Sequence, residues 1–187
     1  MRSAIAGIVC CLAVANVATA QPHPAHASEP SAGNGAAAFE MIRRMVGEWR
    51  APLGKDTMTA VFRPLAYGTA IQAEEWVGGK QFTVTLFYLV DGELRADHFC
   101  DFKNQPRYVA RTKTDGKTIA FELRDVTGLD AHPRHFRATT WQFLGPDHVT
   151  QDWQVAEKGR DVEMIRLAFT RQRSSSGVAV DAARVKP

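Results

Sequence analysis

Apolar and polar residues alternate along most of this chain, in short runs that turn-forming residues separate. The run from Phe82 to Val90 places an apolar residue at every second position, and Asp91-Gly92 then gives the strongest hairpin signal in the sequence. A period of two is typical of β-strands that bury one face. Similar runs recur as far as Arg171, so the pattern predicts about ten short strands.

The connections between these runs are short and rich in glycine, which favours hairpins between neighbouring strands. Regular spacing of many short strands is typical of a sandwich or a barrel. The strands do not alternate with helical segments, so a parallel sheet is not expected. A closed barrel also leaves no strand edge exposed. We therefore predict an all-β fold, an antiparallel up-and-down β-barrel of about ten strands.

One short helix is predicted before the strands, from Ala38 to Val46. Phe39, Ile42 and Val46 fall on one face of a helix with a period of about 3.6 residues, and Gly47 ends the segment. We expect this apolar face to plug one end of the barrel.

The two ends of the chain have compositions that do not predict a packed domain. Residues 1–20 begin with a positive charge at Arg2, continue with an apolar run and end in Ala18-Thr19-Ala20, a pattern typical of a secretory signal peptide. An alternative is a lipoprotein anchor at Cys10-Cys11. Proline, serine and alanine dominate the next segment, which predicts disorder. The predicted organisation is a signal peptide 1–20, a disordered linker 21–37, a barrel domain 38–173 and a disordered tail 174–187.

Charge and cysteine content narrow the expected environment. The formal net charge is +3, and it becomes +2 when Arg2 leaves with the signal peptide. A charge this small predicts no nucleic-acid partner, and no later segment is long and apolar enough to span a membrane. We expect an exported protein, periplasmic or secreted, in which Cys100 is the only cysteine left after cleavage. Cys100 is then buried and inert, reactive, or engaged in an intermolecular disulfide.

His98 and Cys100 are the chemically distinctive pair of the predicted barrel. They share one face of a strand with Leu94 and Ala96, whereas the charged residues of that strand occupy the other face. We therefore expect His98 and Cys100 to point inward, as polar anchors in a mostly apolar ligand cavity. The further residues expected to line or rim this cavity are Tyr88, Glu75, Trp141, Trp153, Asn104 and Gln105.

Other interpretations of the same residues stay open at this level. A buried histidine that is hydrogen-bonded to a neighbour, beside an inert cysteine, is a common structural feature. A catalytic pair would need the Cys100 thiolate, with His98 assisting its formation, but no carboxylate that would orient the histidine is identifiable. The Asn104-Gln105-Pro106 loop is also typical of a simple turn. No metal site or cofactor is expected, since one strand face offers too few ligands for zinc.

Gly47-Glu48-Trp49 at the first strand and Arg171 at the end of the last strand resemble the calycin superfamily, which contains the lipocalins, the fatty-acid-binding proteins and nitrobindin. The resemblance implies a closed barrel in which Trp49 seals one end and Arg171 packs on its ring in a cation–π contact. By analogy with nitrobindin it also implies haem binding as an alternative, with His98 as the iron ligand. Nitrobindin takes this histidine from late in its chain, where His135 and His148 match loosely.

A closer resemblance is to a family of bacterial exported proteins within that group, and it covers residues 39–173. The family carries His-Tyr-Cys on a central strand and then Gly-Asn-Gln-Pro-Arg. The matching residues are His98-Phe99-Cys100 and the segment from Lys103 to Arg107, so phenylalanine replaces tyrosine and lysine replaces glycine. The family has no established activity. We therefore expect non-enzymatic binding of a small, largely apolar molecule, with haem binding or an enzyme using Cys100 and His98 as alternatives.

Overall fold

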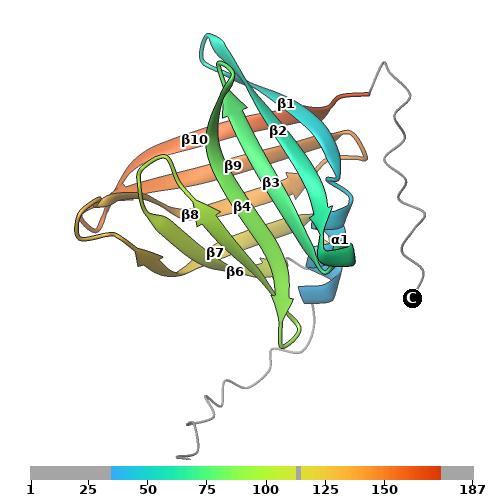
Figure 1. The fold of residues 1–187 in the computed structure, drawn as a ribbon, viewed down its shortest axis with the longest axis horizontal. Coiled ribbons are helices and arrows are strands. Elements are labelled where there is room, and N and C mark those ends of the chain that lie inside the picture. Colours follow the sequence, from blue (N-terminus) through green and yellow to red (C-terminus); the bar gives the residue numbers. More distant parts are fainter. Residues whose placement is uncertain (1–34, 113–114, 174–187) are drawn as a thin grey trace, which may run out of the picture. The chain divides into compact units, whose positions relative to one another are not determined.

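The computed structural model describes residues 35–112 and 115–173 of the chain (Figure 1). The predicted signal peptide, most of the predicted linker and the predicted tail lie outside these residues. Helix α1 spans Gly35–Arg43, and a 3₁₀ turn spans Ala66–Gly68. The strands are β1 (Gly47–Leu53), β2 (Asp56–Leu65), β3 (Ala70–Val77), β4 (Lys80–Val90), β5 (Glu93–Phe99), β6 (Gln105–Thr112), β7 (Thr118–Thr127), β8 (Arg134–Phe143), β9 (His148–Glu157) and β10 (Arg160–Arg171).

The strands of the described region form one closed antiparallel barrel (Figure 1). Each strand pairs with its neighbours in the sequence, and β1 closes the barrel by pairing with β10, where Trp49 lies opposite Arg171. This is the up-and-down barrel that the alternation predicts, and the prediction of fold class is confirmed. The described part of the chain contains no helix that is long and apolar enough to cross a membrane.

The centre of the barrel is filled by large side chains. Trp141 packs against Phe62, Phe87 and Phe121, with ring centroids 6.2, 5.5 and 5.5 Å away, respectively. All four residues are almost completely buried. Since aromatic rings occupy the middle, the space left for a ligand lies toward the two ends.

Strand β4 turns the less apolar of its two faces inward. Thr83, Thr85 and Phe87 are buried, whereas Tyr88 is only half-buried on the outer face. Its hydroxyl donates to Asp97 of β5, which is also outside, at 3.0 Å. The prediction that Tyr88 would line the interior is therefore not matched by its position. The register places polar partners side by side inside the barrel, since Thr83 pairs with Glu75 and Thr85 with His98.

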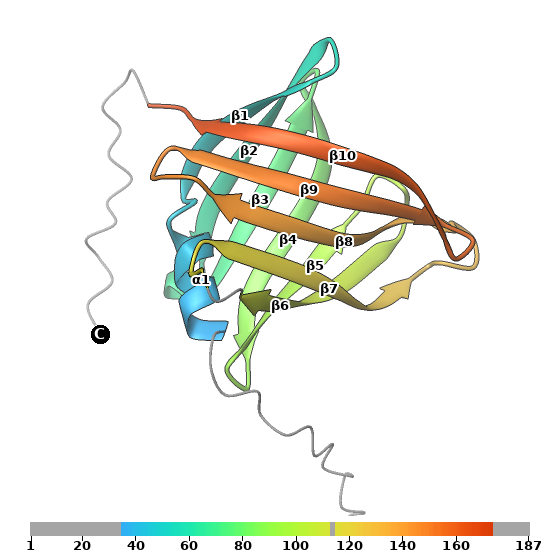
Figure 2. The same cartoon turned by 180° about the vertical axis from the view of Figure 1, so that it is seen from behind.

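Helix α1 covers one end of the barrel and contacts β4, β5 and β6 (Figure 2). It begins at Gly35, three residues before the predicted start, and ends at Arg43. Its buried face includes Phe39 and Ile42, as the periodicity predicts. A tight turn follows, in which the amide of Met45 donates to the Ile42 carbonyl at 2.9 Å. We call this the helix end of the barrel, and the opposite end the open end.

Trp49 and Arg171 meet at the helix end in the predicted arrangement. The guanidinium carbon of Arg171 lies 4.2 Å from the centroid of the Trp49 ring. The Trp49 indole donates to the carbonyl of Met45 at 2.6 Å, and Arg171 donates to the carbonyl of Val46 at 2.8 Å. Arg171 also pairs with Asp147 at 3.1 Å. These contacts tie the segment after α1 to both the first and the last strand.

Candidate functional site

A cavity of about 50 Å³ lies at the open end of the barrel, with mostly apolar walls and a few polar groups. Glu75 of β3, Thr83 of β4, His98 of β5 and Trp153 of β9 contribute to it. Three of the predicted ligand-binding residues, Glu75, His98 and Trp153, are thus brought together. The other lining residues are Leu53, Met58, Phe82, Phe136, Ile165 and Leu167.

His98 is the central polar group of this cavity. Its side chain is buried, and its Nδ1 lies 2.8 Å from the hydroxyl oxygen of Thr85. Its Nε2 is buried and has no hydrogen-bond partner among the described residues. The ring packs against Trp153 and Phe136 at centroid distances of 5.2 and 5.6 Å. Burial lowers the pKa of His98 to about 4, so the imidazole is neutral at pH 7.

Glu75 adds a second buried titratable group. Its carboxylate accepts a hydrogen bond from the Thr83 hydroxyl of the neighbouring strand. Burial raises the pKa of Glu75, and the Thr83 bond offsets part of that rise. Glu74, the next residue toward the N-terminus, faces outward and pairs with Arg63 at 2.6 Å. The two glutamates therefore do not form an acid–base pair, in keeping with the alternation along a strand.

Cys100 lies just past the end of β5 and is not part of this cavity. It is partly buried, and its sulfur accepts a hydrogen bond from the amide of Phe102 at 3.4 Å. Burial raises the pKa of the Cys100 thiol to about 12. Because a nucleophilic cysteine needs its thiolate near neutral pH, and Cys100 has no described contact with His98, the geometry does not favour the Cys–His enzyme.

Two aromatic residues that sequence reasoning did not single out stack on each other at this end of the barrel, and one of them, Phe136, lines the cavity. Phe102, in the loop between β5 and β6, stacks on Phe136 of β8 at a centroid distance of 5.1 Å. The guanidinium carbon of Arg134 lies 5.3 Å from the Phe102 ring. Phe102 lies in a loop, and Phe136 lies beside an irregularity in the β8–β9 register. Period-two alternation gives no signal for such positions.

Gln151 is another interior polar residue that the sequence pattern did not distinguish. It is fully buried on β9, and its side-chain oxygen accepts from the indole of Trp153 at 2.9 Å. Its side-chain nitrogen is buried without a described partner. The only sequence signal is its place between Val149 and Trp153 on the buried face, where an amide side chain stands among apolar residues.

The two predicted amides of the barrel mouth have different positions. Asn104 is buried and donates from Nδ2 to the carbonyls of His132 and Arg134, at 2.9 and 2.7 Å. It therefore fixes the loop between β7 and β8 to the loop between β5 and β6. Gln105 is exposed at the start of β6. Neither lines the cavity.

Replacing Asn104 with alanine is expected to lower the free energy of unfolding by about 2 kcal/mol, because two partly buried hydrogen bonds are lost at about 1 kcal/mol each. Urea unfolding followed by tryptophan fluorescence measures this change. The matched control is Gln105→Ala, an exposed amide one residue away, which is expected to change stability by less than about 0.5 kcal/mol. Equal losses in the two variants would show that Asn104 does not fix the loop.

The remaining predicted residues lie elsewhere. Trp141 belongs to the aromatic centre of the barrel, and its indole donates to the Thr139 hydroxyl at 3.1 Å. His135 is buried outside the cavity, with Nδ1 3.0 Å from the carbonyl of Pro133. His148 is exposed at the start of β9, near the helix end.

The three histidines considered as haem ligands, His98, His135 and His148, do not form a haem site in this structure. A cofactor of that size needs far more than the 50 Å³ beside His98, since even the pockets of drug-sized ligands measure about 300–1,000 Å³. His135 and His148 do not line this cavity, and they do not line a second pocket of about 350 Å³ at the helix end either. Within residues 35–112 and 115–173, no group of three or more His, Cys, Asp or Glu side chains is placed to hold a metal ion.

The fold and the cavity define a class, a closed ten-stranded antiparallel barrel with a buried polar group at one end. Comparison with solved structures finds the same fold in the crystal structure of Rv2717c from M. tuberculosis. That chain superposes with a TM-score of 0.52 and 16% sequence identity, over 73% of this chain and 98% of the other. The similarity shows the fold and is consistent with a calycin-like barrel. No family model and no curated protein matches the sequence.

Proposed function

We propose that this chain is an exported binding protein that takes a small, largely apolar molecule at the open end of its barrel, with His98 as the polar anchor. The observation that carries the proposal is the unpaired Nε2 of His98, which is buried in a wall of the cavity. The composition of residues 1–20 supports export.

An unpaired buried polar atom is costly, by about 1–3 kcal/mol. A ligand that hydrogen-bonds to the Nε2 of His98 would recover this free energy, while the rings of Phe136 and Trp153 and the side chains of Met58 and Leu167 contact its apolar part. Most small-molecule sites combine such apolar walls with a few polar groups.

The charge state of the cavity favours an uncharged ligand. Burial disfavours the charged forms of both His98 and Glu75. An ion would lose its hydration without gaining an opposite charge, which is unfavourable in a buried site. A hydroxyl or a carbonyl group on a compact apolar body fits both the chemistry and the size of about 50 Å³.

Binding can be tested with protein labelled at the methionine methyl groups, because Met58 lines this cavity whereas Met164 is exposed on the outer face. We expect isobutanol to shift the Met58 methyl resonance in an NMR titration and to leave that of Met164 unchanged. His98→Leu, which removes the polar atom and keeps an apolar side chain, is expected to weaken this binding about tenfold, the equivalent of one hydrogen bond of about 1.4 kcal/mol.

The matched control is His135→Leu, since His135 is also buried but lies outside the cavity. This variant is expected to bind isobutanol as the unmodified protein does. Two results would contradict the proposal: a Met58 resonance that does not respond, or a His98→Leu protein that binds as tightly as His135→Leu.

A further inference from the structure

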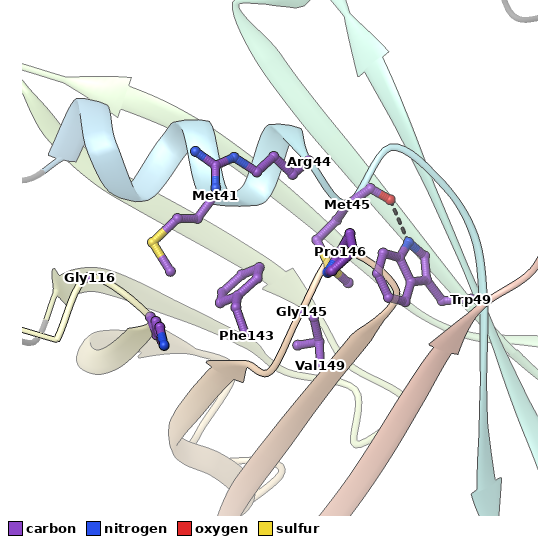
Figure 3. Close-up of a pocket in the computed structure, with 10 residues that line it drawn as sticks. Met41, Arg44, Met45, Trp49, Gly116, Phe143, Gly145, Pro146 and Val149 are labelled. Atoms are coloured by element: carbon purple, nitrogen blue, oxygen red, sulfur yellow. Dashed lines mark hydrogen bonds between the residues drawn. The ribbon is translucent and has the colours of Figure 1, made fainter.

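A second pocket, of about 350 Å³, lies at the helix end and is separate from the cavity of the open end. Figure 3 shows α1 and the segment after it on one side, and the strand ends and turn of β8 and β9 on the other. Its volume falls within the range of small-molecule sites, about 300–1,000 Å³. Its lining consists of Met41, Arg44, Met45, Trp49, Gly116, Lys117, Phe143, Gly145, Pro146 and Val149.

The walls of this pocket are apolar and adaptable. Met41 and Met45 come from α1 and the turn after it, and Phe143, Pro146 and Val149 come from β8, β9 and the turn between them (Figure 3). Methionine has a flexible, polarisable side chain that adjusts to ligands of different shape and packs well against aromatic rings. The walls therefore suit a flat or branched apolar body.

The only charged side chains that line the pocket, among the described residues, are two cations. Arg44 and Lys117 are exposed, and neither has a carboxylate within ion-pair distance in the described part of the chain. In contrast, the neighbouring Arg43 pairs with Glu40 at 3.5 Å, and Arg171 pairs with Asp147 at 3.1 Å.

The nearby carboxylates are engaged by other groups. Asp115 accepts hydrogen bonds from the amides of Lys117 and Thr118 and from the Thr118 hydroxyl. Asp147 is held by Arg171 and by Arg173. The edge of the pocket thus presents positive charge beside an apolar interior.

We infer that the helix-end pocket binds an apolar monoanion, such as an aryl or alkyl carboxylate. Its apolar body would lie between α1 and the β8–β9 turn, and its carboxylate would reach Arg44 and Lys117. An arginine and a lysine both donate charge-assisted hydrogen bonds to a carboxylate. The inference is independent of the proposed function, because the two sites share no lining residue.

The test compares two probes with the same carbon skeleton, 4-phenylbutyrate and its uncharged analogue 4-phenylbutanol, on the full chain with labelled methionine methyl groups. We expect 4-phenylbutyrate to shift the Met41 and Met45 resonances and not that of Met58, which reports on the other cavity. The alcohol should bind at the same place about fivefold more weakly at low salt, because two solvent-screened ion pairs are missing. Added salt should reduce the difference.

The double variant R44Q/K117Q removes both cations while leaving the buried core intact, since both side chains are exposed. It is expected to bind the acid and the alcohol equally. The matched control is K55Q/K80Q, which removes the same charge from the exposed β1–β2 turn and the exposed start of β4 at the open end and should retain the fivefold preference. Shifts confined to Met58, no shifts at Met41 and Met45, or an unchanged preference in R44Q/K117Q would each overturn the inference. Failure of isobutanol at Met58 would affect only the proposed function.

Discussion

Replacement of Trp49 by alanine is expected to lower the free energy of unfolding by about 3–5 kcal/mol, the usual cost of truncating a buried aromatic side chain. Trp49 is only 1% exposed and packs where the first strand meets the last. The truncation removes its packing, its hydrogen bond to the Met45 carbonyl and the ring beneath Arg171. Urea unfolding with a two-state fit measures the loss.

The matched control is Trp76→Ala, the same truncation on the outer face of β3, where the side chain is half-buried. It removes as many atoms without opening the barrel, so its cost is expected to be clearly smaller. If the two variants lost equal stability, the helix end would not depend on Trp49 as its seal.

The charge of Arg171 can be separated from its packing with Arg171→Met. Methionine keeps an apolar stem over Trp49 but cannot donate to the carbonyls of Val46 and Pro146 or pair with Asp147. Since it leaves these acceptors without their donor, we expect it to be destabilising as well, although less than Trp49→Ala. A cation–π contact of this kind contributes about 0.5–2 kcal/mol.

The helix end illustrates what the sequence could predict. The resemblance to the calycin superfamily implied the contact between Trp49 and Arg171, and the closed barrel places these two residues opposite each other where β1 pairs with β10. The buried face of β9 includes the alternate apolar residues Val149, Trp153 and Val155, and the two buried residues of β10, Leu167 and Phe169, are also alternate apolar positions. In these elements the local pattern and the global fold agree.

The open end could be predicted only in part, because its interior is polar. The pattern of β4 marks Tyr88 and its apolar neighbours as one face, but the barrel buries Thr83 and Thr85, which find partners in Glu75 and His98 on the adjacent strands. Such cross-strand pairs depend on register, which a single strand does not reveal.

The side-chain positions of the loop residues could not be predicted for a different reason. Phe102 and Cys100 lie beyond the end of β5, where alternation no longer fixes the direction of a side chain. In this loop Phe102 stacks on Phe136, and the sulfur of Cys100 accepts a hydrogen bond from the backbone amide of Phe102. His98 and Cys100 are two residues apart in the sequence, yet only His98 lines the cavity.

The buried imidazole makes stability depend on pH in a defined direction. Burial lowers the pKa of His98 from 6.5 to about 4 in the folded protein, so the unfolded chain binds the proton first as pH falls. The folded state therefore loses stability as pH falls below about 6.5, and the loss levels off only below the folded pKa of about 4. Between pH 7 and pH 5 this contribution is about 2 kcal/mol, and it approaches 3 kcal/mol at pH 4.

The titration of Glu75 has the opposite effect on stability over part of this pH range. Burial raises its pKa, so the folded state binds this proton more readily than the unfolded chain, and stability rises as pH falls toward 4.5. The His98 contribution must therefore be isolated with a variant. His98→Gln keeps a polar side chain that does not titrate, and the difference in unfolding free energy between it and the unmodified protein is expected to change by about 2 kcal/mol from pH 7 to pH 5.

Glu75→Gln provides the complementary control, because it removes the opposing carboxyl and leaves the imidazole in place. The loss of stability between pH 7 and pH 5 should then be larger than in the unmodified protein. If His98→Gln and the unmodified protein followed parallel pH profiles, His98 would not be titrating as a neutral buried group. The cavity would then be wet enough to solvate the imidazolium, and the preference of this site for uncharged ligands would lose its physical basis.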